Sequence, residues 1–135
     1  MLTIHTGTND DAVAVEGDRI AAVAAVDALR AHYPGARVRE WPGELRPGTG
    51  WEVAPPDAPS PRERVHALLL RGVTAVAPGA FNDDPGLGPA AARVGLPVGM
   101  PAPLVVGSRA DFAVFAADGS CLATVLAGRL VHRRR

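Results

Sequence analysis

Side chains that could carry metal or acid-base chemistry are few in this sequence. Its histidines are His5, His32, His66 and His132, and no two of them stand at the spacing of paired metal ligands. Glu63 and His66 form one E-x-x-H pair, which would lie on one face of a helix. Di-iron bundles use this spacing, but they need a second such pair and further carboxylates on facing helices, and the sequence has neither. We therefore favour a first-turn carboxylate and an ordinary helix histidine.

The only thiol of the chain, Cys121, lies in the alternating run Cys-Leu-Ala-Thr-Val-Leu. Such alternation is typical of a half-buried strand, and no histidine stands beside this cysteine in the sequence. A single cysteine also excludes an intrachain disulfide. We predict a structural thiol on a strand.

The loop at residues 79–88 is the best candidate for a binding feature. Its candidate ligand-binding residues are Asn82, Asp83, Gly86 and Gly88. The two glycines would allow close backbone approach, and a helix starting at Pro89 would present free amides to an anion. Against this, the carboxylates of Asp83 and Asp84 would repel a phosphate, and the context of a P-loop is missing. A surface connector is the favoured interpretation.

Length, charge balance and hydropathy exclude several classes of partner. The 135 residues fit one domain, and 14 basic residues balance 14 acidic ones. This balance gives no argument for nucleic-acid or membrane-surface binding. No apolar run approaches the ~18 residues of a membrane helix, and no basic leader precedes an apolar stretch at the N-terminus. We expect a cytoplasmic protein whose partners include neither a nucleic acid nor a membrane.

The first third of the chain predicts strands and one short helix. The strands are expected at residues 2–6, 12–15, 19–25, 36–40 and 44–46. Gly17-Asp18 is a tight-turn signal, so the second and third strands should form a hairpin. Asp27 is predicted to be the N-cap of a helix that runs to Tyr33.

The middle of the chain predicts a connector followed by helix-strand units. Residues 47–61 are rich in proline, which removes backbone donors and disfavours both helix and central strand. Ser60 is predicted to cap a helix opened by Pro61, with Glu63 completing a capping box. A strand at 73–77, a short helix at 89–94 and a segment at 96–99 should follow.

The last third predicts a three-stranded meander. Its strands are expected at residues 111–115, 121–126 and 129–132, separated by turns at Asp118-Gly119 and Gly128. We expect the edges of this meander to pair with the N-terminal strands.

Two stretches near the N-terminus, at residues 11–25 and 38–48, resemble the start of the amidohydrolase superfamily, particularly its imidazolonepropionase-like and aminohydrolase members. Residues 106–115 and 121–132 resemble the last segment of the same family. In that family, a Pro-Gly pair is followed by a short strand ending in His-x-His, whose imidazoles hold a catalytic zinc or iron. Here Pro47-Gly48 is present, but the two ligand positions are Val53 and Pro55. Neither side chain can bind a metal.

The resemblance implies the fold. In full-length members the two ends of the chain close into one small β-rich domain beside a TIM-like barrel, and such a barrel needs about 250 residues. We therefore predict a mixed α/β single domain that keeps the composite β-domain and lacks most of the barrel. Residues 1–48 and 104–135 should form a small β-sandwich or strongly bent sheet. Residues 49–103 should form a connector and a helix-strand insert.

Because the metal ligands are replaced, the resemblance favours a non-catalytic relative, a pseudoenzyme without a metal cofactor. The missing barrel should leave an apolar face on the β-domain, which self-association or a partner would cover. We expect an interaction or accessory subunit that forms a homodimer or binds a full-length amidohydrolase-like partner.

Two alternatives remain open at the level of the sequence. The first is a zinc- or iron-dependent hydrolase of non-peptide C–N bonds, acting on a cyclic amide, an amidine or an aminated purine. Its site would be rebuilt across a dimer interface from His66, Asp57, Glu63 or Asp83. The second is a small-molecule sensor that uses the loop at residues 79–88.

Overall fold

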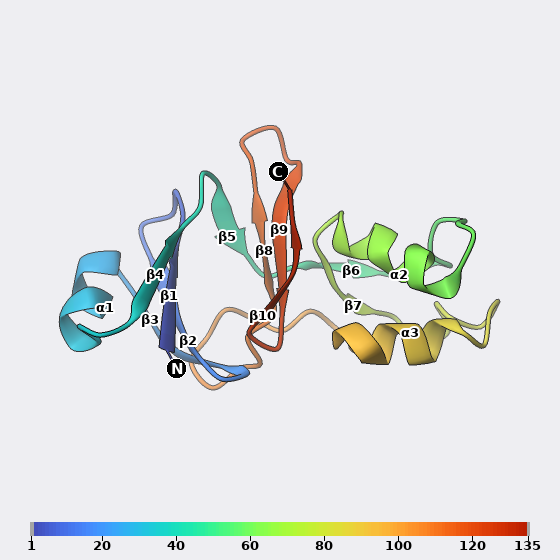
Figure 1. Ribbon diagram of the computed structural model, residues 1–135, viewed down its shortest axis with the longest axis horizontal. Coiled ribbons are helices and arrows are strands. Elements are labelled where there is room, and N and C mark those ends of the chain that lie inside the picture. Colours follow the sequence, from blue (N-terminus) through green and yellow to red (C-terminus); the bar gives the residue numbers. More distant parts are fainter. Residues whose placement is uncertain (1, 135) are drawn as a thin grey trace.

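The structure is a computed structural model that describes residues 2–134. Its elements lie in successive layers along the long axis of the molecule: a helix, two sheets, and a helix-strand unit (Figure 1). The mixed α/β class is confirmed, and no closed barrel occurs within the described residues. None of the helices within residues 2–134 is long and apolar enough to cross a membrane.

The first sheet is built by the N-terminal strands in the order β3-β2-β1-β4. These strands are β1 (Leu2–Thr6), β2 (Ala12–Glu16), β3 (Arg19–Ala24) and β4 (Arg37–Glu40). Strands β2 and β3 form the predicted hairpin, whereas β4 pairs in parallel with β1. Parallel strands need a crossover, and α1 (Val26–His32) provides it on the outer face of this sheet, where Leu29 is buried against Ile4 and Ala14.

The second sheet has the order β10-β9-β8-β5 and lies at the centre of the molecule. Its strands are β5 (Glu44–Arg46), β8 (Phe112–Phe115), β9 (Cys121–Leu126) and β10 (Arg129–Arg133). The predicted meander is confirmed, and its β8 edge pairs with β5 from the N-terminal part of the chain. Cys121 is buried on β9, as predicted for a structural thiol.

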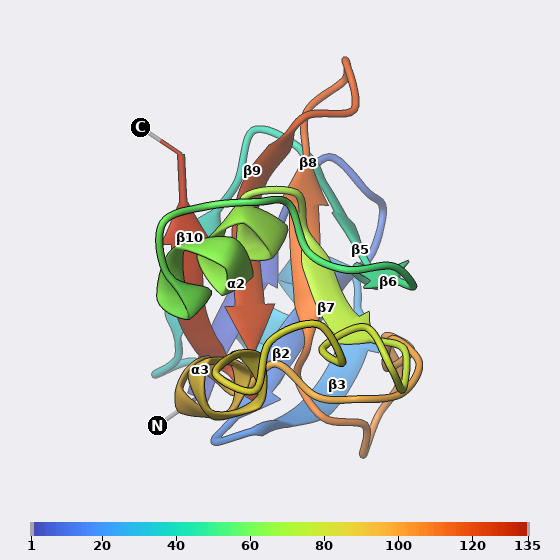
Figure 2. The same cartoon turned by 90° about the vertical axis from the view of Figure 1, so that its right-hand side faces the viewer.

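The remaining elements form a helix-strand unit on the far face of the central sheet, in front of β8–β10 in Figure 2. They are β6 (Thr49–Trp51), α2 (Pro61–Leu69), β7 (Val73–Val76) and α3 (Leu87–Val94). Strands β6 and β7 pair in parallel. Leu68, Leu69 and Leu87 form the core of this unit together with Leu126 of the central sheet.

The core between the two sheets contains an unusual polar contact. Trp41 Nε1 donates a hydrogen bond to His5 Nδ1 at 3.2 Å, and Phe112 packs edge-on against the His5 ring at 5.0 Å between centroids. The ring nitrogen that accepts must be unprotonated, so the proton of the neutral imidazole lies on Nε2. Burial, and next the charges of Arg39 and Arg37, lower the pKa of His5 to about 4.

The β9–β10 turn of the central sheet packs closely against the β2–β3 turn of the first sheet. In the β9–β10 turn, Ala127 and Gly128 have φ angles of 51° and 78°. The carboxylate of Asp111 accepts the Ala127 N–H at 2.7 Å, although burial raises the pKa of this carboxyl. A Cβ atom at Gly128 would collide with the carbonyl oxygen of Gly17 in the β2–β3 turn. Only glycine therefore fits at position 128.

Three local predictions are wrong. Asp27 lies in the first turn of α1 rather than at its N-cap, which is Ala25 with no side-chain hydrogen bond. The carboxylate still favours the helix N-terminus through the helix dipole. Within the proline-rich connector, Thr49–Trp51 forms β6, because these three residues keep their backbone donors and β7 offers them a partner.

The third error concerns the second helix-strand unit. Helix α3 begins at Leu87 rather than Pro89, since proline is tolerated within the first turn. The segment after it makes only one bridge in the described residues, between Val98 and Val76.

The buried His5 predicts a specific pH dependence. Its pKa is lowered from the usual value of about 6.5, so the unfolded chain takes up the proton more readily than the folded one. The contribution to stability is therefore complete above about pH 6.5, and it should decrease by about 3 kcal/mol as the pH falls towards 4. Chemical denaturation across this range should show the loss.

The matched variant is His5→Asn, whose Oδ1 can accept the Trp41 N–H but does not titrate. Its free energy of unfolding should depend less steeply on pH between pH 6.5 and pH 4. The difference in slope should correspond to about one proton fewer taken up on unfolding. Identical pH profiles for the variant and the wild type would contradict this assignment.

Candidate functional site

The two positions that hold metal in the resembling family lie just after β6. Val53 extends into solvent, with 65% of its surface exposed. Pro55 is buried, and its carbonyl oxygen accepts a hydrogen bond from Arg64 Nη2 at 2.9 Å. The chain at these positions thus presents a hydrocarbon side chain and an occupied carbonyl group.

Arg64 organises the surroundings of this segment. It projects from α2, is only 8% exposed, and also donates from Nε to the Pro56 carbonyl at 3.3 Å. On its other side it pairs with Asp83 at 2.9 Å and with Asp84 at 3.8 Å. Because a buried charge needs partners, one side chain fixes both the connector and the 79–88 loop onto α2.

Of the candidate residues in the 79–88 loop, some lie close to Arg64 and others do not. Asp83 is an ion-pair partner of Arg64, and Gly86 donates its N–H to Asp84 Oδ1 at 2.8 Å. Gly86 also packs on Pro61, whereas Gly88 has open space around it in α3 and Asn82 is exposed. The loop carboxylates Asp83 and Asp84 are therefore engaged with Arg64, and Asn82 is the candidate side chain that this arginine does not engage.

The N-cap predicted at Ser60 is confirmed, but the Glu63 carboxylate accepts from the Ser60 hydroxyl instead of from the Ser60 backbone N–H that a full capping box uses. Ser60 Oγ accepts the Glu63 N–H at 3.2 Å and donates to the Glu63 carboxylate at 3.2 Å. Glu63 and His66 do not act as a pair, because Glu63 is turned back towards the cap. Asp57 is exposed on the connector. The four candidates for a rebuilt metal site, His66, Asp57, Glu63 and Asp83, are thus not brought together in this chain.

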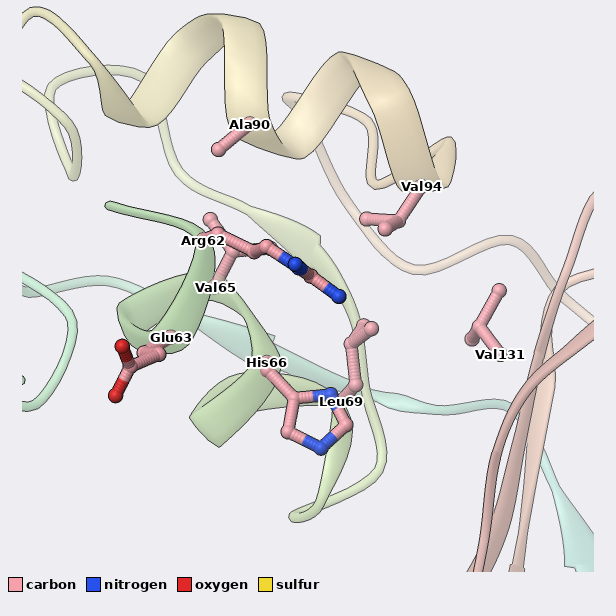
Figure 3. A pocket seen from close by; sticks show the side chains of 8 residues that line it. All are labelled: Arg62, Glu63, Val65, His66, Leu69, Ala90, Val94 and Val131. Carbon is pink, nitrogen blue, oxygen red and sulfur yellow. The ribbon is translucent and has the colours of Figure 1, made fainter. Parts of the chain in front are cut away.

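His66 instead lines a cavity of about 440 Å³ between α2, α3 and β10. Figure 3 shows the Arg62 guanidinium pointing into this cavity and the Glu63 carboxylate pointing away from it. The lining residues are Arg62, Glu63, Val65, His66, Leu69, Ala90, Val94 and Val131. Apart from Arg62, Glu63 and His66, every one of them is aliphatic.

A second imidazole lies beside the cavity. The ring of His132 on β10 stands 6.5 Å from that of His66, nearly perpendicular to it at 86°. Burial, and next the nearby His66, lower the pKa of His132. Within residues 2–134, no three His, Cys, Asp or Glu side chains converge as a metal-binding group. The cavity therefore combines the Arg62 guanidinium and the His66 imidazole with an aliphatic surface, and His132 lies beside it. This arrangement is suited to binding a small ligand.

Neither of the two arginines of α2 was predicted from the sequence as a functional residue. A signal for Arg64 was available, since it precedes Leu68 by four residues and therefore lies on the apolar face of the helix. No comparable signal marks Arg62, because its role depends on the distance of α3 and β10 from α2.

The family model for imidazolonepropionase-like composite domains of bacteria matches residues 12–36, which cover β2, β3 and α1. The resemblance to this composite domain is confirmed. The match covers a small part of the chain, and the matched segment contains none of the residues around the cavity or Arg64.

Two solved structures are similar to the chain. One is a guanine deaminase from Bradyrhizobium japonicum, with 17% sequence identity, a TM-score of 0.47 and coverage of 64% of this chain. The other is an ochratoxinase from A. niger, with 15% identity, a TM-score of 0.47 and coverage of 74%. The similar regions span only 27% and 30% of those two proteins. Among curated proteins, none matches this sequence.

The role of Arg64 gives a prediction about local stability. In an Arg64→Met variant, the Pro55 and Pro56 carbonyls and the two aspartates lose their shared partner. We expect the free energy of unfolding to fall by about 1–3 kcal/mol, a range that allows for the solvent exposure of Asp83. Hydrogen exchange should accelerate most in the 79–88 loop, while the β-sandwich amides keep their protection.

The matched control is Arg62→Met, on the same helix but with an exposed side chain. Its stability and exchange pattern should remain close to those of the wild type. Equal effects of the two substitutions would show that Arg64 has no special positioning role.

Proposed function

We propose that this chain is a non-catalytic, amidohydrolase-like module that acts as an interaction or accessory subunit. The observation that carries the proposal is the chemistry at positions 53 and 55. Val53 has no donor atom, and the Pro55 carbonyl is engaged by the buried Arg64. Asp83 and Asp84 of the neighbouring loop are engaged by the same arginine, whereas Glu52 and Asp57 of the connector are exposed. Within residues 2–134, no three His, Cys, Asp or Glu side chains gather as a metal-binding group elsewhere.

An exposed apolar surface supports an interaction role. Val53, Val98 and Met100 are 65%, 60% and 89% exposed, and we call them the sheet-end patch. All three flank the β6–β7 sheet: Val53 follows β6, Val98 bridges to β7, and Met100 precedes Pro101, which lies against Gly50 of β6. Parallel strands are normally covered by further structure, so this end of the molecule is suited to a partner.

A second copy of the chain is the partner we favour. The net charge of zero means that two copies do not repel each other overall. A two-fold interface would place the same patch of each copy against the other and remove all six side chains from water. A full-length amidohydrolase-like protein is the other partner that the patch could accept.

Substitution of the patch tests the association. We expect the wild type to sediment as a dimer at micromolar concentration, and a Val53→Asp/Met100→Asp variant to sediment as a monomer with unchanged circular dichroism. The matched control is Val106→Asp, because Val106 is also 65% exposed but lies in the loop that leads to β8. It should remain dimeric. A monomeric wild type at all concentrations would rule out the homodimer and leave only the full-length partner.

Metal content tests the absence of catalysis independently. Protein purified without chelators or a histidine tag should contain zinc, iron and manganese far below one atom per chain, because Val and Pro supply no ligand. Hydrolysis of cyclic amides and aminated purines should be undetectable. One tightly held metal per chain or per dimer, together with hydrolysis that a His66→Ala substitution abolishes, would replace this proposal with a rebuilt hydrolase.

A further inference from the structure

We infer that the cavity between α2, α3 and β10 binds a small amphipathic monocarboxylate, whose carboxylate pairs with Arg62. The cavity of about 440 Å³ lies away from the sheet-end patch and does not include positions 53 or 55. The inference is therefore independent of the proposed interaction role, and either can fail without the other.

The charge in the cavity has no counterpart in the chain. Within residues 2–134, Arg62 makes no ion pair and no side-chain hydrogen bond, although Arg64 two positions later makes several. The nearest acidic neighbour in the sequence, Glu63, is held by Ser60 and points away from the cavity (Figure 3). The guanidinium that points into the cavity is therefore available to an anion from solution.

The geometry of the polar groups suits a carboxylate. A guanidinium presents parallel N–H donors that match the two oxygens of a carboxylate. The ring of His66 lines the same cavity and can donate one further N–H. The guanidinium balances a single negative charge, and the imidazole adds one donor. A phosphate with about two negative charges would need further cations and donors.

The apolar part of the lining determines the rest of the ligand. The apolar part of the lining consists of five aliphatic side chains: Val65, Leu69, Ala90, Val94 and Val131. They come from two helices and a strand, and the volume lies in the lower part of the range of about 300–1,000 Å³ that is usual for small-molecule sites. A medium-length alkyl chain or a small aromatic ring would cover these side chains while the carboxylate reaches Arg62.

Octanoate is the probe that tests this site. Calorimetric titration of the full chain should show saturable binding of one octanoate per chain, and methyl NMR signals of Leu69, Val94 and Val131 should shift with the same saturation curve. Octan-1-ol has the same alkyl chain without the charge, and it should bind at least about tenfold more weakly because the charge-assisted hydrogen bonds are missing.

Two arginine variants separate a built site from general attraction. Arg62→Gln removes the charge from an exposed side chain and should weaken octanoate binding about tenfold or more, with unchanged circular dichroism. Arg93→Gln removes an exposed charge from α3 outside the cavity lining and should leave the affinity within about twofold. Binding of octan-1-ol should be insensitive to both substitutions.

Three results would overturn the inference. The first is no saturable octanoate binding to the wild type. The second is equal weakening by Arg62→Gln and Arg93→Gln, which would indicate nonspecific attraction. The third is shifts confined to methyl groups outside the cavity.

Discussion

The two inner strands of the central sheet, β8 and β9, are buried on both faces, and the rest of the architecture follows from this constraint. Every residue of β8 and five of the six residues of β9 are buried. On one face Phe112 and Val125 pack against the N-terminal sheet, and on the other Leu126 and Thr124 meet the helix-strand unit, where Thr124 donates to the Leu69 carbonyl at 2.7 Å. Such strands cannot stay in water, so two earlier segments of the chain, residues 2–40 and 49–94, must cover their two faces.

Arg64 links this packing to positions 53 and 55, where the resembling family has its metal ligands. Its helix is anchored on the central sheet, and its guanidinium draws the connector and the 79–88 loop together. The frame of β6, α2 and β7 is therefore held by buried contacts and by one ion-pair network that do not require a metal. This explains how a segment with Val53 and Pro55 in place of two histidines can keep the form of a parallel strand-helix-strand unit.

Local signals in the sequence predicted much of this fold. Ser60 and Glu63 form the expected cap, and the turn at Gly128 joins β9 to β10 as the glycine indicated. Two errors concern where elements begin. Strand β6 forms because β7 lies beside it, and α1 begins at Val26, directly after the end of β3 at Ala24 and the N-cap Ala25. The cavity could not be predicted, because its walls come from segments about 70 residues apart in sequence that only the folded sheet brings together.

Helix α2 directs its two arginines into different surroundings. Arg62 and Arg64 are two residues apart, about 200° around the helix, so one reaches the cavity and the other turns into the protein. Four carboxylates are already engaged, Glu63 with the helix cap, Asp83 and Asp84 with Arg64, and Asp111 with the Ala127 N–H, whereas Asp57 is exposed on the connector. A hydrolytic site needs a base or a metal to activate water. The two imidazoles near the cavity stand 6.5 Å apart, and within residues 2–134 no three His, Cys, Asp or Glu side chains gather to hold a metal. The Arg62 guanidinium beside them can pair with an anion, which is the binding that we infer for this cavity.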